Sequence, residues 1–306
     1  MNRQQIEKLV KKVNLDTAKG SVNPRIQEIV VRLVTELFQV IEDLDISQTE
    51  VWKGIEYLTD AGQANELGLL AGGLGLEHYL DLRADEADAQ AGITGGTSRT
   101  IEGPLYVAGA PESVGFARMD DGSESNTVDT LFIEGTVTDT EGNLLKNAKV
   151  EIWHANGLGN YSFFDKSQSD FNLRRTIFTD ENGQYVAQTT MPVGYGCPPD
   201  GTTQALLNQL GRHGQRPSHV HYFISAPNYR KLTTQFNIEG DEYLWDDFAF
   251  ATREDLITTA IEITDPAEIS RRGLDKPFKK ITFNVELVKD NPQAPSTEVD
   301  RRHLSL

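Results

Sequence analysis

The spacing of apolar residues changes once along the chain, from about 3.6 residues to about 2, and this change most constrains the fold. Over the first hundred residues, apolar side chains recur every three or four positions, as on one face of a helix. From about Leu105 onward they alternate with polar side chains, as in a strand with one buried face. We therefore predict an α+β fold, with a helical domain over residues 1–103 and a β-sandwich domain with long loops over residues 104–306.

The helical part carries recognisable start positions. Asn23-Pro24 reads as an N-cap residue followed by proline at the first helical position, and an apolar stripe then runs over residues 26–44. Ser47 and Glu50 form an S-x-x-E capping box before the next apolar pattern. A short helix is expected around residues 67–70, before a pair of glycines.

The second part reads as strands separated by turns. Turn-forming residues occupy 139–142 and 180–183. Short helices are expected near 203–210 and 253–261, and the polar tail after Asp290 is expected to run over the surface. The predicted strands are 131–139, 148–155, 185–191, 219–225 and 280–288.

Composition excludes several classes of function. The chain has 29 basic and 46 acidic side chains, a net charge of −17, which disfavours binding to nucleic acid or to anionic lipid. Its one cysteine, Cys197, permits neither an internal disulfide nor a cysteine-rich metal site, and we interpret it as a packing residue. We see neither a signal-peptide pattern nor an apolar run of the ~18 residues that a membrane span needs. We therefore expect a cytoplasmic protein with no membrane partner.

A pair of histidines and two tyrosines are the residues best suited to chemistry. His219 and His221 are two apart on a predicted strand, so their side chains point to the same face and could bind one metal ion. A bare H-x-H pair more often binds nothing. Tyr161 follows a Gly-containing loop, and Tyr195 lies between two glycines, which let the backbone approach a ligand closely. Each tyrosine taken alone could equally be an ordinary half-buried residue.

The order tyrosine, tyrosine, H-x-H adds information that no single residue carries. The segments VEIWHANGLGNYS (150–162), PVGYGCPPDG (192–201) and GQRPSHVHYFISAPNYRKLTTQF (214–236) contain these residues in that order. They resemble the iron-site segments of the intradiol dioxygenases. The resemblance extends over nearly the whole chain, because the helical part also resembles the catechol 1,2-dioxygenase branch of that family.

This resemblance implies a site and a reaction. One Fe(III) per chain would be held by Tyr161, Tyr195, His219 and His221. Phenolates are hard anionic donors, and two of them favour Fe(III) over Fe(II). The implied reaction is cleavage of catechol by O2, between its two hydroxyl-bearing carbons, to cis,cis-muconate during aromatic degradation (the β-ketoadipate pathway). Catalytic roles are implied for Tyr195, as the ligand that leaves the iron, and for Arg216 and Gln235, which face the catechol.

The resemblance also implies a substrate pocket and partners. Its apolar walls would suit an unsubstituted catechol ring better than one bearing a carboxylate. A homodimer is expected through the helical domain, which could also hold a lipid-like molecule. Glycine at position 72 departs from the proline expected in many relatives. The implied substrate-binding residues are Leu69, Gly72, Ile101, Pro104, Leu105, Arg216, Phe248 and Ala249.

Three alternatives compete with this interpretation. The first is a related intradiol enzyme that prefers substituted catechols or hydroxyquinol. The second is a cupin-type metalloenzyme, but no glutamate follows the histidine pair shortly afterwards, and the only later histidine is His303 in the tail. The third is a binding sandwich with unused histidines, which does not explain why Tyr161 and Tyr195 both lie in Gly-flanked loops. Packing roles around the site are assigned to Trp153, His154, Phe163 and Phe164.

Overall fold

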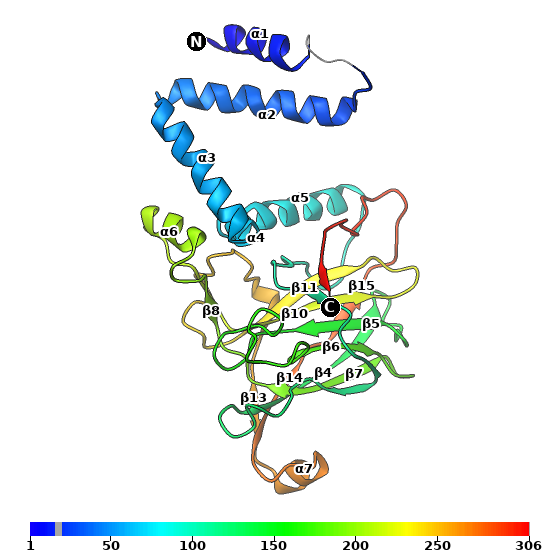
Figure 1. Ribbon diagram of the computed structural model, residues 1–306. Coiled ribbons are helices and arrows are strands. Elements are labelled where there is room, and N and C mark those ends of the chain that lie inside the picture. Colours follow the sequence, from blue (N-terminus) through cyan, green and yellow to red (C-terminus); the bar gives the residue numbers. More distant parts are fainter. Residues whose placement is uncertain (16–19, 306) are drawn as a thin grey trace. The chain divides into compact units, whose positions relative to one another are not determined.

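The computed structural model describes residues 1–15 and 20–305 and confirms the α+β class (Figure 1). Contacts divide the chain into two compact units, Met1–Ala64 and Asn65–Leu306. The predicted division at 103/104, between a helical and a β-sandwich domain, stays a prediction. No helix in the described ranges is long and apolar enough to cross a membrane.

The first unit consists of three helices. They are α1 (Arg3–Asn14), α2 (Pro24–Asp43) and α3 (Gln48–Gln63). Both predicted helix starts are confirmed: the Asn23 side chain accepts N–H groups of the first turn of α2, and Ser47 forms the reciprocal capping box with Glu50.

The apolar stripe of α2 lies at the surface of the described chain. Ile6 and Val10 of α1 are buried, and Arg3 pairs with Glu36 of α2. The apolar stripe of α2 is not covered by α1: Leu33 is 64% and Leu44 71% exposed. Large exposed apolar surfaces of this kind are uncommon in monomers.

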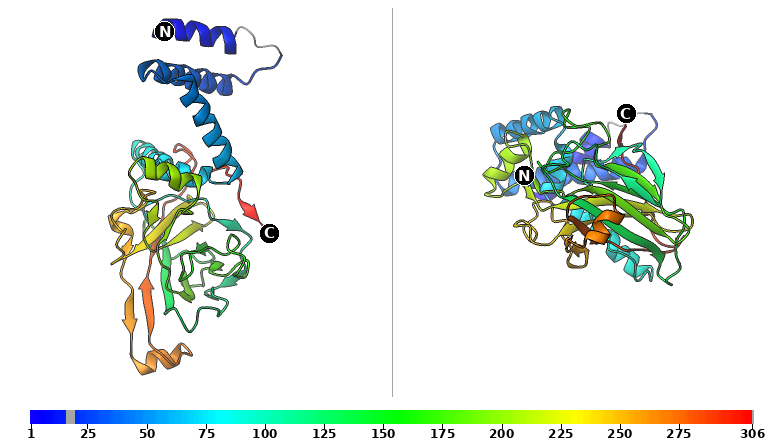
Figure 2. Two further views of the ribbon diagram at one scale, coloured as in Figure 1. Left: turned by 60° about the vertical axis from the view of Figure 1, so that its left-hand side comes forward. Right: turned by 90° about the horizontal axis from the view of Figure 1, so that it is seen from below.

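The second unit begins with α4 (Leu67–Gly73) and α5 (Leu76–Gln90), followed by two large sheets (Figures 1 and 2). The helix expected near 67–70 is confirmed as α4, whereas α5 was not predicted as a separate element. One sheet has the order β12 (Ile257–Thr258), β11 (Leu232–Ile238), β10 (His219–Ser225), β5 (Lys149–Trp153), β6 (Arg174–Phe178), β2 (Glu112–Val114). The other has the order β13 (Ile261–Ile263), β14 (Phe278–Thr282), β4 (Thr130–Asp139), β7 (Gln184–Thr190), β3 (Phe116–Arg118), with β15 (Val285–Leu287) also paired to β4.

Smaller elements connect and extend these sheets. The helix expected near 203–210 is present as α6 (Thr202–Gln209). Two-stranded pairs form between β1 (Val107–Ala108) and β16 (Leu304–Ser305), and between β8 (Tyr195–Gly196) and β9 (Gln215–Arg216). A long arm, drawn in orange in Figure 2, carries α7 (Pro266–Arg271) between β13 and β14. The tail after Asp290 is largely exposed, as predicted; its last residue, 306, lies outside the described residues.

The main core is sandwiched between the two sheets. Val220, Tyr222 and Ile224 of β10 belong to it together with Leu131 and Ile133 of β4. Because side chains alternate along a strand, His219, His221 and Phe223 lie on the other face of β10. That outer face is also buried, so every residue of β10 from 219 to 224 is shielded from solvent.

The prediction of a helix near 253–261 is wrong. A single 3-10 turn, η1 (Glu254–Leu256), is followed by two short strands. Ile257 pairs with Asn237 of β11, and Ile261 pairs with Lys280 of β14. This stretch is rich in isoleucine and threonine, whose branched side chains favour extended backbone, and open sheet edges are available to pair with it.

The strand predicted over 280–288 is real but interrupted. β14 ends at Thr282 and β15 begins at Val285. The Tyr185 hydroxyl donates to the carbonyl of Phe283 at 2.7 Å, and the Asn284 side chain accepts the N–H of Thr136 at 3.0 Å. Tertiary hydrogen bonds therefore replace part of the ladder at this point.

Candidate functional site

The two histidines of β10 converge on one point. Their Nε2 atoms are 3.1 Å apart, and both side chains are buried. The ring N–H at Nδ1 of His219 donates to the carbonyl of Pro217 at 2.6 Å, which leaves a lone pair on Nε2. The ring of His221 is stacked on Trp153, with centroids 4.9 Å apart and planes 6° apart. Each imidazole is thus fixed by a different neighbour.

The two tyrosines reach the same point from loops. Tyr161 follows β5 in a loop that Asn156 shapes, because its side-chain oxygen accepts the N–H groups of Leu158 and Asn160. The Tyr161 hydroxyl is 3.4 Å from Nε2 of His219. Tyr195 lies on β8, and its ring is 5.3 Å from that of Tyr161 and 5.5 Å from that of His219. The structure therefore brings all four predicted ligands together.

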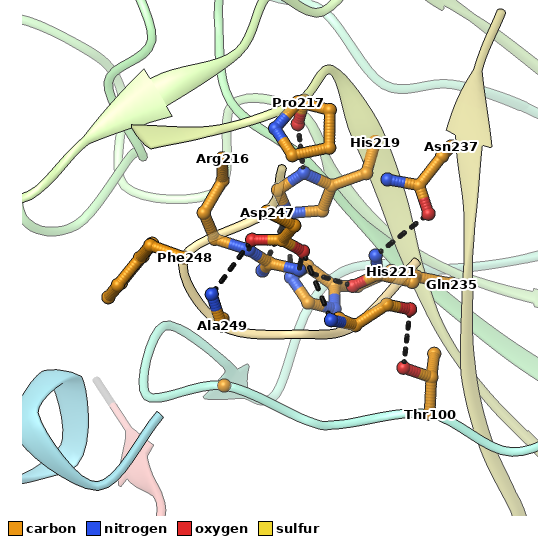
Figure 3. A network of polar contacts seen from close by, with 12 residues as sticks. Thr100, Arg216, Pro217, His219, His221, Gln235, Asn237, Asp247, Phe248 and Ala249 are labelled. Carbon is orange, nitrogen blue, oxygen red and sulfur yellow. Dashed lines mark hydrogen bonds and ion pairs between the residues drawn. The ribbon is translucent and has the colours of Figure 1, made fainter. Parts of the chain in front are cut away.

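Arg216 forms the polar wall of the site (Figure 3). Its guanidinium donates twice to Asp247 at 3.1 Å, once to Gln235 at 2.9 Å, and lies 3.0 Å from Nε2 of His219. Gln235 in turn donates to Asn237 at 3.1 Å. The two residues predicted to face the substrate are thus hydrogen-bonded to each other beside the histidines.

Asp247 is a residue of this site that the sequence did not point to. It is buried, pairs with Arg216, and accepts the N–H groups of Ala249 and Ala251. Burial opposes its ionisation, but Arg216 outweighs this and holds the pKa of the Asp247 carboxyl below its usual value. A buried arginine often has a carboxylate partner, but no spacing in the sequence singles out Asp247 for this role.

Burial shifts the pKa values of all four predicted ligands in the direction that favours their neutral forms. It lowers the pKa of His219 to about 3 and that of His221 well below its usual value. Burial also raises the pKa of Tyr195, and raises that of Tyr161 well above its ordinary range. The imidazoles are therefore neutral donors at pH 7, and the phenols need a strong positive charge nearby in order to ionise.

This donor set fits a ferric ion. Two neutral imidazole nitrogens and two phenol oxygens lie around one buried point, and a trivalent cation is the charge that would make both phenols into phenolates. In the described ranges no group of three or more His, Cys, Asp or Glu side chains offers a competing metal site.

The predicted pocket residues fall into two neighbouring groups. Ile101, Phe248 and Ala249 share one buried cluster with Cys197, and Leu105 packs against a second cluster that contains Tyr161. The helix α4 adjoins the first group: a Cβ on Gly72 would lie 3.9 Å from Ala249, and one on Gly68 would lie 2.8 Å from Pro104. Leu69 lies half-buried in the same helix.

Arg212 bridges helix α4 and the loop after Asp247, and the sequence did not point to this residue either. Its guanidinium donates to the carbonyl of Gly73 at 2.7 Å and to that of Phe248 at 3.1 Å. It also lies over the ring of Phe250, 5.0 Å from the centroid. One side chain thus fixes α4 against the loop that follows Asp247.

Of the four residues interpreted as packing, Trp153 and His154 are buried, whereas Phe163 is half-buried and Phe164 is 41% exposed. His154 is buried, its Nδ1 donates to the carbonyl of Ala155, and its Nε2 accepts from the Thr189 hydroxyl, both at 2.7 Å. Trp153 supports His221, and the rings of Phe163 and Phe164 contact each other. His154 therefore has no free nitrogen for a metal.

Comparison with known proteins identifies relatives over nearly the whole chain. The family described as "Dioxygenase" matches residues 101–288, and "Catechol dioxygenase N terminus" matches residues 23–92. Catechol 1,2-dioxygenase of Acinetobacter guillouiae is 77% identical over 295 residues, covering 96% of this chain and 97% of that protein. The crystal structure of catechol 1,2-dioxygenase from Acinetobacter radioresistens superposes with a TM-score of 0.99 at 80% identity, covering 100% of this chain and 99% of the other.

More distant relatives include enzymes named for other substrates. Chlorocatechol 1,2-dioxygenase of Pseudomonas putida is 33% identical over 238 residues, covering 78% of this chain and 87% of that protein. The family match covers more than half of the chain, and the identities far exceed those of a shared fold alone. The chain therefore belongs to the intradiol catechol dioxygenase family.

Proposed function

We propose that this protein is a catechol 1,2-dioxygenase, which uses O2 to open catechol between its hydroxyl-bearing carbons and forms cis,cis-muconate. The observation that carries the proposal is the convergence of two tyrosines and two histidines on one buried point beside Arg216. Neither a cupin-type site nor an unused histidine pair accounts for the two tyrosines.

The proposed cofactor is one Fe(III) per chain, held by Tyr161, Tyr195, His219 and His221. When bound, Fe(III) supplies Lewis acidity that draws electron density from the catecholate ring and opens a ring carbon to attack by O2. The neutral imidazoles and the two phenolates leave a net charge of +1, which suits an anionic substrate.

The chain's own residues position the substrate and handle its protons. Tyr195 lies on a two-residue strand and is only half-buried, so we assign it as the ligand whose phenolate oxygen accepts a catechol proton. Arg216 is held rigidly by Asp247 and presents its Nη1 group towards His219. A fixed guanidinium at this place stabilises negative charge that develops on the substrate. Gln235 fixes the guanidinium from the other side.

The proposed pocket favours catechol over substituted or more polar rings. Its walls would be formed by Leu69, Gly72, Ile101, Pro104, Leu105, Phe248 and Ala249, with Arg216 as the polar contact. The alternative is an enzyme that prefers substituted catechols or hydroxyquinol. Identities of 50–77% to relatives named for catechol, against 31–33% to those named for chlorocatechol, favour catechol.

We further propose a cytoplasmic homodimer assembled through the helical domain. The exposed apolar stripe of α2 supports this, because a second copy would remove it from water. A lipid-like molecule bound within the helical domain is also consistent with this apolar surface. Sedimentation at micromolar concentration tests the assembly: a dimer is expected, and a monomer would refute it.

The proposed function is tested by three measurements on one preparation: iron content, visible absorption and product formation from catechol. We expect one iron per chain, a broad phenolate-to-Fe(III) band that changes when catechol is added, and muconate as the product. An active, fully metallated but colourless protein would exclude the two tyrosines as ligands.

A further inference from the structure

Arg174, the first residue of β6, is a buried cation that the proposed reaction does not use. Its side chain is 1% exposed. Its Nε donates to the Ser162 hydroxyl at 2.9 Å and its Nη2 to the Ser162 carbonyl at 3.1 Å. Over residues 1–15 and 20–305 no carboxylate pairs with it, and its Nη1 has no hydrogen-bond partner. Burying a charge without a counter-charge is costly, so its position calls for a functional reason.

The guanidinium faces a predicted iron ligand. Its central carbon lies 5.7 Å from the centroid of the Tyr161 ring, within the range of cation–π attraction. Ser162, which accepts both hydrogen bonds, is the next residue in the chain. Arg174 therefore holds the backbone beside Tyr161 and places a positive charge over its ring at the same time.

Strained backbone lies next to both residues of the Arg174–Ser162 contact. Phe163, just after Ser162, has φ +74°, and Leu173, just before Arg174, has φ +58°. Residues other than glycine avoid this region, and each such residue costs roughly 1–3 kcal/mol. Leu173 is fully buried and its N–H donates to the carbonyl of Met119 at 3.0 Å, which fixes the strained turn. The contact between Arg174 and Ser162 is therefore flanked by a strained residue in each of the two segments, Phe163 in one and Leu173 in the other.

Arg216 provides an internal comparison. It too is a buried arginine at the site, but Asp247 neutralises it with two hydrogen bonds. No carboxylate of the described residues pairs with Arg174 in this way, so its charge is free to act on the Tyr161 ring. A Tyr161 phenolate bound to the proposed iron would supply the missing counter-charge.

We propose that Arg174 is a positioning residue for Tyr161, which fixes this tyrosine as the permanent phenolate ligand and sets its donor strength. The inference rests on the proposed iron site. It separates the roles of the two tyrosines: Tyr161 is held by a dedicated cation, whereas Tyr195 lies on a short strand opposite an arginine that is already neutralised.

The test compares Arg174→Met with wild type in the iron-loaded enzyme, using visible absorption and competition for iron by a chelator. Removing the cation raises the energy of the phenolate electrons, so the charge-transfer band should move to longer wavelength. Loss of this outer support should also weaken iron binding about 10–100-fold. Arg175→Met is the matched control: it removes the neighbouring arginine of the same strand, which donates only to backbone carbonyls. Its band should match that of the wild type.

An unshifted band in Arg174→Met with full iron would overturn the proposal and make Arg174 a structural residue. If that variant does not fold, Arg174→Lys and Ser162→Ala decide. Each keeps a positive charge at residue 174 but removes the hydrogen bond from Nε of Arg174 to the Ser162 hydroxyl, and Ser162→Ala leaves the bond to the backbone carbonyl in place. A smaller shift to longer wavelength is expected in both, and wild-type spectra in both would overturn the proposal. A wild-type protein with no band at all would instead refute the iron site itself.

Discussion

The histidine half and the tyrosine half of the site are built in different ways. His219 and His221 lie on a strand with a neighbour on each side, and His221 is paired with Gln235 on one side and Trp153 on the other. Tyr161 and Tyr195 lie outside the large sheets, one in a loop and one on a two-residue strand. Backbone ladders fix the first pair, and side-chain hydrogen bonds and close glycine contacts fix the second.

This difference indicates which half of the site should tolerate substitutions. A ladder holds both histidines through many cooperative hydrogen bonds, so the distance between their Nε2 atoms is a property of the sheet itself. The tyrosine loops depend on a few residues, among them Asn156, Gly159 and Arg174. We expect changes on the histidine side to abolish the site and changes on the tyrosine side to alter it by degrees.

The largest effect is expected from His221→Ala. It removes one of two nitrogens that the sheet presents, so bound iron and the visible band should both fall to background while circular dichroism shows a folded chain. His213→Ala, a half-buried histidine that pairs with Asp246, serves as the control and should keep its iron. Full iron and colour in His221→Ala would show that the histidine pair is not the rigid half of the site.

Arg216→Lys should keep iron and lose most of its turnover. Lysine retains the charge but cannot contact Asp247, Gln235 and the site at once. The loss of one oriented donor is commonly worth about 10²–10³ in rate. Turnover and iron are measured on the same preparation. Parallel loss of both would make Arg216 part of the metal site, and near wild-type turnover would remove it from catalysis.

His154, at the start of the tyrosine loop, should make stability depend on pH. Burial lowers its pKa to about 4 in the folded chain, so between about pH 6.5 and 4 the unfolded chain binds more protons. Stability therefore falls as the pH falls through this window, by up to about 3 kcal/mol from this group. His154→Gln cannot titrate, so its stability deficit relative to wild type at pH 7.5 should shrink by that amount at pH 4. A deficit that does not change with pH would contradict this.

The smallest effect is expected from Gly159→Ala. This glycine has φ +81°, and a Cβ there would lie 3.0 Å from the Gly194 carbonyl oxygen and from Cβ of Tyr195, where the two tyrosine loops meet. We expect a loss of roughly 1–2 kcal/mol in stability and an altered visible band, with iron retained. Gly142→Ala is the matched control, because φ is +82° but no atom lies within 4 Å. An unaltered band in Gly159→Ala would mean that the tyrosine loops are as rigid as the strand.

Residues that act through local geometry were predictable from the sequence. The alternation around His219-Val220-His221 predicts a strand with both imidazoles on one face, and the structure confirms the strand. The N-cap at Asn23 and the capping box at Ser47 were also predictable, because a helix start satisfies its own N–H groups within one turn. Tyr161 and Tyr195 drew attention through glycines in their loops, but only the order of motifs joined them to the histidines, since neither has a spacing of its own.

The sequence by itself determined the α+β class and the strand that presents the histidines, because periodicity acts between neighbouring residues. The four proposed donors came from the resemblance of three motifs, taken in order, to the intradiol dioxygenases. Only the tertiary structure decided that Asp247 neutralises Arg216, that Arg212 joins the two sides of the pocket, and that Arg174 lies uncompensated over Tyr161. It also decided that residues 257–263 extend as strands. These outcomes depend on charges and sheet edges brought together from distant parts of the chain, and no local pattern encodes such pairings.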